Sequence, residues 1–152
     1  MSKALDIRRG GEFRMAEAAS RPNADARPLS PHLQIYSPLI NMMMSILHRI
    51  TGAALYFGTL ILVLWLVAAA TGRGNYDLVT GLMKTPVGLA VLAGYTWALI
   101  HHALGGIRHF IWDTGRGFAL GPVNFMSWMT ILGSLTITGG IWFYIFKARG
   151  LL

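Results

Sequence analysis

Residues 50–71 read ITGAALYFGTLILVLWLVAAAT, a stretch without a charged side chain. An α-helix rises about 1.5 Å per residue, so roughly 20 apolar residues cross the ~30 Å hydrocarbon core of a bilayer. This stretch is therefore predicted to be a transmembrane helix. Its helix is expected to begin earlier, near Asn41.

Two further apolar runs follow, at 86–107 and 122–146. The joints between the three runs are short and polar, TGRGNYDLVTGLMKT and RHFIWDTGRGFALG. Pro86 suits the first turn of a helix, where a backbone N–H has no partner to lose. We predict an all-α membrane protein with three transmembrane helices, at about 41–71, 86–113 and 122–147. Residues 41–152 would form this membrane anchor, and residues 1–40 a partly extended cytoplasmic segment.

Small polar residues recur every four positions in the last run, at Thr130, Ser134 and Thr138. Such stripes allow helices to approach closely, although small residues are also common in membrane helices generally. Three helices alone make a thin bundle. We therefore expect them to be part of a heteromeric helix bundle with a partner in the membrane.

The composition agrees with a membrane solvent. Of 152 residues, 54% are hydrophobic and 12% are charged, and the mean hydropathy is +0.51. A soluble domain has about 25% charged residues. The net charge of +7 lies mostly outside the apolar runs and comes with no nucleic-acid motif, so we expect lipid contact and no nucleic-acid binding. The chain has no cysteine, which excludes disulfides and thiolate metal sites.

The positive charges predict the orientation, because cytoplasmic segments are enriched in Lys and Arg. Nine of the thirteen lie before residue 50 or in the second joint, and four lie on the other side. We expect a multi-pass protein with a cytoplasmic N-terminus and a periplasmic C-terminus. Residues 1–27 are Arg-rich but also contain acidic residues, which mitochondrial transit peptides lack, so a bacterial cytoplasmic membrane is predicted.

Ionisable side chains in or near a membrane helix are costly and are candidates for function. The first cluster is Ser45, His48 and Arg49, whose spacing places them on one face at the start of the first helix. A hydroxyl, an imidazole and a guanidinium suit a polar head group such as a quinone carbonyl or a carboxylate. The alternative is that His48 and Arg49 only cap the helix and reach lipid phosphate.

The second cluster is HHALGGIRHFIWD, at the end of the second helix. His102 and His109 are seven residues apart, two turns along one face, with Gly105 and Gly106 between them. Neutral imidazole is a natural axial ligand of haem iron, and the glycines would leave room for a flat macrocycle. The alternative is that the histidines form hydrogen bonds between helices or relay protons.

Both clusters are expected in the cytoplasmic half of the bilayer. The first helix starts at that face and the second returns to it, and His102 lies six residues before Arg108, about 9 Å deeper. A cofactor with carboxylate arms could contact both clusters. Its iron would lie at His102 and its propionates near His48, Arg49 and Arg108.

These motifs resemble a known family, the cytochrome b556 subunit of succinate dehydrogenase, which is the larger membrane anchor of respiratory complex II. The resemblance rests on RPLSPHLQIY at 27–36, SILHRITG at 45–52, and HxxxGIRHxxWD from His102 to Asp113. It extends from Arg27 to the end of the chain.

The resemblance implies haem b, shared with a second small membrane anchor subunit, with this chain's iron ligand at His102. Neighbouring His101 lacks the seven-residue step to His109. His48 and Arg49 match positions near the haem propionates, and Arg108 and His109 are expected in the same pocket. Ser45 and Arg49 match the ubiquinone site, where Ser45 would donate a hydrogen bond and Arg49 would stabilise developing negative charge.

The resemblance further implies an iron–sulfur subunit and a flavoprotein subunit as partners. Electrons from succinate would pass through them to ubiquinone as substrate, and no residue of this chain would oxidise succinate. Two alternatives stay open: the anchor of a quinol:fumarate reductase, which runs in reverse, and a haem-free structural membrane scaffold.

Overall fold

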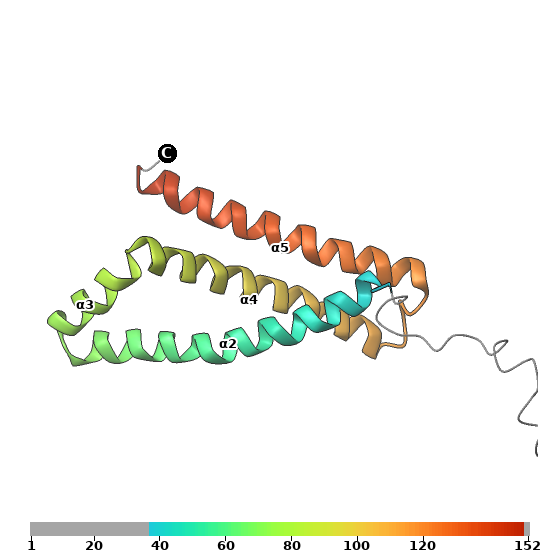
Figure 1. The fold of residues 1–152 in the computed structure, drawn as a ribbon, viewed down its shortest axis with the longest axis horizontal. Helices are drawn as coiled ribbons and strands as arrows, with labels where there is room; N and C mark the ends of the chain where they lie inside the picture. The colour runs from blue at the N-terminus through green and yellow to red at the C-terminus, as the bar shows by residue number, and fades with distance from the viewer. Residues whose placement is uncertain (1–36, 151–152) are drawn as a thin grey trace, which may run out of the picture. The chain divides into compact units, whose positions relative to one another are not determined.

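The computed structural model describes residues 37–150, and the motif at 27–36 lies outside the described residues. The helices belong to one compact unit that begins at Pro38. Their order is α2 (Ile40–Thr71), α3 (Arg73–Met83), α4 (Pro86–Asp113) and α5 (Leu120–Ala148). In Figure 1, α2 and α4 run antiparallel with α3 at their connection, and α5 returns along α4. α4 packs against both α2 and α5.

Local chemistry explains where the helices begin and end. Thr85 caps α4, because its side chain accepts a hydrogen bond from the N–H of Gly88 at 3.1 Å, and Pro86 occupies the first turn. Gly72 separates α2 from α3 with a φ of 127°, in a region that side chains rarely adopt. Gly115 and Gly117 have positive φ in the turn between α4 and α5.

The joint between the first two spans was expected to be a polar connection, but it contains the helix α3. Its 11 residues form an amphipathic helix, in which Leu78, Val79, Leu82 and Met83 recur at helical spacing. Val79 is buried. The joint therefore follows the helical period although it is too short and polar to cross a membrane.

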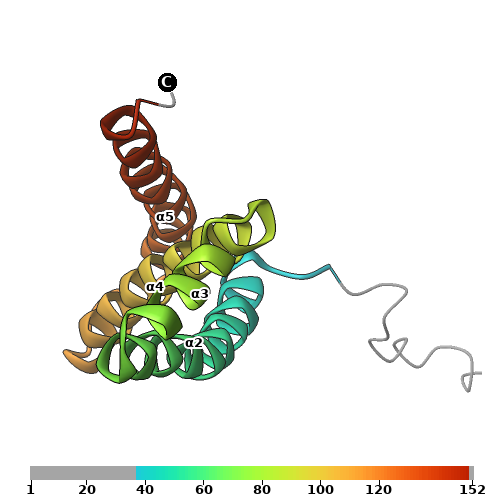
Figure 2. The ribbon, with the colours of Figure 1, turned by 90° about the vertical axis from the view of Figure 1, so that its left-hand side faces the viewer.

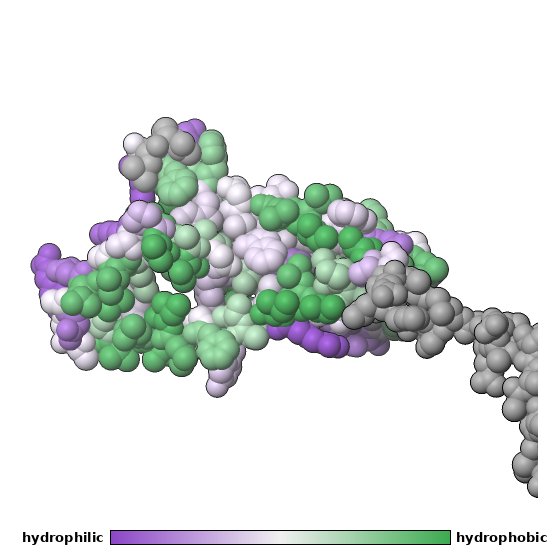
Figure 3. All heavy atoms as spheres, in the orientation of Figure 1, coloured by the Kyte–Doolittle hydropathy of each residue, from purple (hydrophilic) through white to green (hydrophobic). Residues whose placement is uncertain are grey.

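The unit has a largely apolar exterior, and several polar side chains are buried in its interior. The helices α2, α4 and α5 are long and apolar enough to cross a membrane. Most of their large hydrophobic side chains are exposed. Figure 3 shows hydrophobic residues over much of the visible side of α2 and hydrophilic residues at the end where α3 lies. The largest fully buried side chains are polar: His101, Thr51, Ser127 and Ser134. This inversion of the soluble pattern confirms an all-α membrane protein with three candidate spans.

Figure 2, viewed along the bundle, shows α4 with α2 and α5 on different sides. The buried residues of α4 are Ala98, His101, Gly105 and Arg108. Their spacing of three and four residues makes one continuous stripe along the helix. On α5 the buried residues are Val123, Ser127, Thr130 and Ser134, so Thr130 and Ser134 of the small polar stripe face the bundle interior.

Candidate functional site

The adjacent histidines of α4 contact different helices. His101 is 1% exposed, and its Nδ1 lies 3.2 Å from the Ser134 hydroxyl of α5. His102 is half-buried, and its Nδ1 lies 3.1 Å from the backbone oxygen of His48 in α2. Consecutive residues of a helix point about 100° apart, so His101 can contact α5 while His102 contacts α2.

The contact with His48 requires a proton on Nδ1 of His102. A carbonyl oxygen only accepts, so Nδ1 must carry the proton and donate it. The Thr51 hydroxyl, 3.4 Å from the same nitrogen, itself lies within hydrogen-bond distance of the backbone oxygens of Leu47 and His48. Within the described residues, Nε2 of His102 has no hydrogen-bond partner. An imidazole whose Nδ1–H is held by a carbonyl and whose Nε2 is free has the arrangement of metal-ligating histidines.

His102 belongs to a column of three imidazoles. The rings of His48 and His102 are stacked with centroids 4.0 Å apart and an interplanar angle of 5°. The ring of His109 lies 5.1 Å from that of His48. The seven-residue spacing thus places His102 and His109 around the same side chain of α2.

Two glycines make this close packing possible. A Cβ at Gly52 of α2 would lie 2.9 Å from Cε1 of His102, and a Cβ at Gly105 of α4 would collide with Nδ1 of His48. Each helix therefore offers a glycine opposite the histidine of the other. In the chain alone, the open side of Gly105 receives the His48 ring, whereas a Cβ at Gly106 would meet nothing within 4 Å.

Ser45 and Arg49 lie one turn apart on α2, and both are exposed. Neither makes a side-chain hydrogen bond or an ion pair with the described part of the chain. His48, between them in the sequence, turns inward to α4 instead. Ser45 and Arg49 are therefore available to a ligand or another chain.

Arg108 differs from expectation. The residue is 3% exposed, its Nη1 donates a hydrogen bond to the Ser127 hydroxyl at 3.2 Å, and its Cζ lies 5.0 Å from the centroid of the Trp112 ring. The reason is helical geometry: six residues turn a helix by roughly 600°, which places Arg108 about 120° away from His102 around α4. It therefore faces α5, on the side of His101, and does not join the imidazole column.

Three residues of this arrangement were not identified as functional from the sequence: Thr51, Ser127 and Ser134. Each is at most 1% exposed and contacts a histidine or an arginine. The stripe with four-residue spacing that contains Ser134 was visible in the sequence. The spacing does not show which hydroxyl contacts which imidazole.

Comparison with known proteins identifies the family. Residues 23–141 match the family model for the succinate dehydrogenase/fumarate reductase transmembrane subunit. The chain is 40% identical over 116 residues to the succinate dehydrogenase cytochrome b556 subunit of Rickettsia typhi, which covers 76% of this chain and 90% of that protein. For the b556 subunit of Paracoccus denitrificans the identity is 38% over 115 residues, with coverages of 76% and 88%.

A mitochondrial relative is similar over a smaller part of its length. The human succinate dehydrogenase cytochrome b560 subunit is 38% identical over 111 residues, or 70% of this chain and 63% of that protein. Together with the family model, which spans most of the described helices, these matches agree with the three-span fold and with the motifs on α2 and α4. The chain belongs to the succinate dehydrogenase/fumarate reductase transmembrane subunit family.

Proposed function

We propose that this chain is the large membrane anchor of a succinate:ubiquinone oxidoreductase, with haem b bound at His102 and ubiquinone beside Ser45 and Arg49. The relatives named above are succinate dehydrogenase subunits, which supports this direction over fumarate reduction. The partners would be a second small anchor subunit, an iron–sulfur subunit and a flavoprotein subunit. Succinate would be oxidised in those soluble subunits.

The observation that carries the haem proposal is the state of His102. Its Nδ1–H is held by the His48 carbonyl, Nε2 is free among the described residues, and the ring is half-buried. His101 is a poorer candidate because it is 1% exposed and bonded to Ser134. Haem b, when bound, would supply a one-electron carrier. The second iron ligand would come from the partner anchor subunit.

The neighbours of His102 fit the edge of a haem pocket. Nδ1 of His48 is buried without a hydrogen-bond partner in the described chain, and Arg49 follows on the next helical position. We assign His48, Arg49 and His109 to the propionate side of the pocket. Arg108 is left out of this assignment because it points to α5.

The quinone proposal rests on the free side chains of α2. Ser45 can donate a hydrogen bond to a quinone oxygen, and Arg49 can stabilise negative charge that develops on that oxygen during reduction. Both are exposed in the isolated chain and lie within about three turns of the start of α2, near the membrane surface. An electron-carrying soluble subunit could dock there.

The haem proposal is tested with a pair of adjacent substitutions in the purified complex. His102→Ala should abolish the b-type band in reduced-minus-oxidised spectra, because it removes the iron ligand. His101→Ala is the matched control and should keep the band. A wild-type complex without a b-type band would support the haem-free scaffold, and an unchanged band in His102→Ala would refute the ligand assignment.

The quinone proposal is tested by separating two activities. Arg49→Leu should lower ubiquinone reduction while leaving succinate oxidation by an artificial acceptor unchanged. Arg73→Leu, at the start of α3, is the control and should affect neither. Equal loss of both activities in Arg49→Leu would indicate failed assembly rather than a quinone role. Menaquinone as the sole bound quinone would favour the fumarate reductase alternative.

The orientation is also part of the proposal. Nine positive charges against four favour a cytoplasmic N-terminus and a periplasmic C-terminus in a bacterial cytoplasmic membrane. This places Ser45, His48, Arg49 and His102 in the cytoplasmic half, on the side where the soluble subunits would be found.

A further inference from the structure

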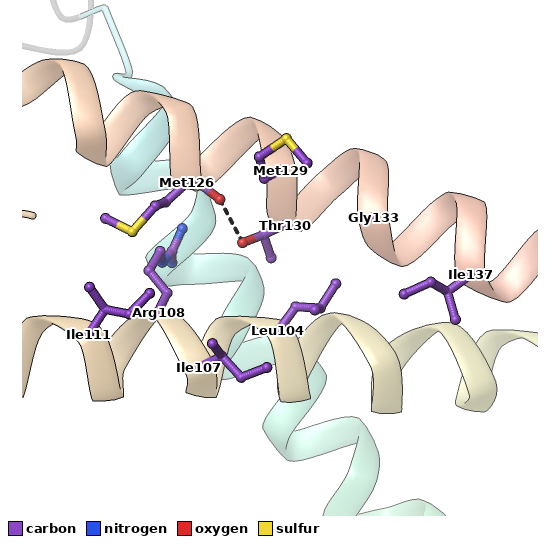
Figure 4. A pocket seen from close by; sticks show the side chains of 9 residues that line it. All are labelled: Leu104, Ile107, Arg108, Ile111, Met126, Met129, Thr130, Gly133 and Ile137. Atoms are coloured by element: carbon purple, nitrogen blue, oxygen red, sulfur yellow. Dashed lines mark hydrogen bonds between the residues drawn. The ribbon is translucent and has the colours of Figure 1, made fainter.

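A cavity of about 270 Å³ lies between α4 and α5, on a different side of α4 from the imidazole column. Figure 4 shows its lining, which is apolar except for Arg108 and Thr130. The Thr130 hydroxyl is satisfied by the backbone oxygen of Met126 at 2.8 Å. Thr130 therefore needs no external partner, and Arg108 is the polar lining residue whose role is unexplained.

Arg108 is a buried cation without an anion. The described residues contain two carboxylates, Asp77 and Asp113, and Arg108 forms an ion pair with neither. Its Nε is buried without a partner, and so is Nε1 of Trp112, whose ring lies 5.0 Å from the guanidinium. Two neighbouring buried donors thus lack an acceptor. A buried charge is costly unless it is paired, so the missing acceptor is expected from outside this chain.

The cavity has a polar end and an apolar end. α5 starts where α4 ends, so Ile111 and Met126 lie at the connected end, and Leu104 and Ile137 at the other. Arg108 is five residues from the end of α4, about 7.5 Å along the axis. On α5, the lining residues from Met126 to Ile137 span about 16 Å along the helix axis, toward the interior of the membrane. A charge near the surface followed by an apolar slot matches a phospholipid.

We propose that this cavity is a lipid site, in which Arg108 binds the phosphate of an anionic phospholipid and one acyl chain lies along Leu104, Gly133 and Ile137. The only carboxylate at this end of the described chain is Asp113, which does not contact Arg108. The pocket therefore offers nothing for the amine of a zwitterionic lipid, and an anionic head group is favoured. Basic pockets between membrane helices near the cytoplasmic side bind such lipids. The proposal does not depend on haem or quinone.

The test measures lipid retained by the purified complex. Native mass spectrometry is performed after exchange into detergent and titration with phosphatidylglycerol or phosphatidylcholine. The wild type should retain one phosphatidylglycerol in preference to phosphatidylcholine. Arg108→Gln should weaken that binding about fivefold or more, from roughly 1 kcal/mol per basic residue, and Arg108→Lys should weaken it less. Arg116→Gln, in the following turn, is the control and should retain the lipid.

A second variant keeps the test informative if Arg108→Gln misfolds. Met129→Trp fills the cavity while keeping the arginine, and it should also displace the lipid. Unchanged phosphatidylglycerol binding in both variants would overturn the proposal, as would equal retention of phosphatidylcholine by the wild type. Loss of the haem band with lipid retained would show that Arg108 pairs with a propionate instead. Loss of the second anchor chain with lipid retained would show a protein partner in the cavity.

Discussion

Gly105 and Gly106 allow the packing of the imidazole column to be tested with two adjacent substitutions. Alanine at 105 would place a Cβ in collision with the His48 ring, whereas alanine at 106 would meet nothing within 4 Å. The His48 ring cannot yield easily, because it is stacked on His102 at 4.0 Å and has His109 at 5.1 Å. We predict that Gly105→Ala is destabilising and that Gly106→Ala is not.

The magnitude follows from two opposing effects. Replacing a helical glycine by alanine stabilises by about 0.5–1 kcal/mol, and this gain is common to both variants. Overpacking at a rigid contact costs about 1–3 kcal/mol and applies to Gly105→Ala alone. The two variants should therefore differ in unfolding free energy by about 1–3 kcal/mol. Gly106→Ala should be neutral or slightly more stable than the wild type.

The assay is titration of the purified complex with a denaturing detergent, followed by helical circular dichroism and by the b-type band. Gly105→Ala should unfold at lower detergent than Gly106→Ala and should lose the band first, since the displaced His48 ring disturbs the carbonyl that orients His102. In a His48→Ala background the penalty of Gly105→Ala should shrink by more than half, because residues in contact are not additive.

Two results would refute this reasoning. If both alanine variants lose stability equally, the open side of the glycine pair is needed by something outside the chain, such as the macrocycle expected from the sequence. If Gly105→Ala remains equally damaging without the His48 side chain, the collision is not with that ring.

Three further outcomes are expected. Thr85→Ala removes the cap of α4 and should cost about 0.5–2 kcal/mol in the same detergent titration, with the haem spectrum unchanged; a shifted spectrum would contradict a purely local role. Ser134→Ala removes the partner of His101 and should cost about 0.6–2 kcal/mol, measured against Ser45→Ala, which should cost nothing in stability. Alkaline phosphatase fused after residue 150 should be active in the periplasm, and an inactive fusion beside an active N-terminal one would reverse the proposed orientation.

The three spans were predictable because bilayer thickness fixes a length that the sequence must match. The expected ranges 41–71, 86–113 and 122–147 correspond to helices at Ile40–Thr71, Pro86–Asp113 and Leu120–Ala148. α3 was not expected, because hydropathy distinguishes spans from joints but does not separate a short amphipathic helix from a loop. Its apolar residues at helical spacing were the available signal.

The site was predictable only in part, because spacing shows which residues share a face and not what that face meets. The seven-residue step places His102 and His109 on one face of α4, and both rings lie near that of His48. The same rule applied to Arg108 would have separated it from His102, since six residues do not complete whole turns. The contacts that the hydroxyls of Thr51, Ser127 and Ser134 make depend on how the neighbouring helices are rotated about their axes. A single sequence does not reveal that rotation.

The choice between His101 and His102 shows what structure adds to periodicity. Ala98, His101, Gly105 and Arg108 form a stripe at spacings of three and four, and the chain buries all four against its own helices. Within that stripe, His101 is 1% exposed and its Nδ1 is hydrogen-bonded to Ser134, which makes it a poorer candidate for an iron ligand. His102 lies at the edge of that stripe, half-buried, oriented by one contact and free at the opposite ring nitrogen. In a subunit that completes its site with a partner, the residue to test first is therefore the oriented one at the edge of the buried face.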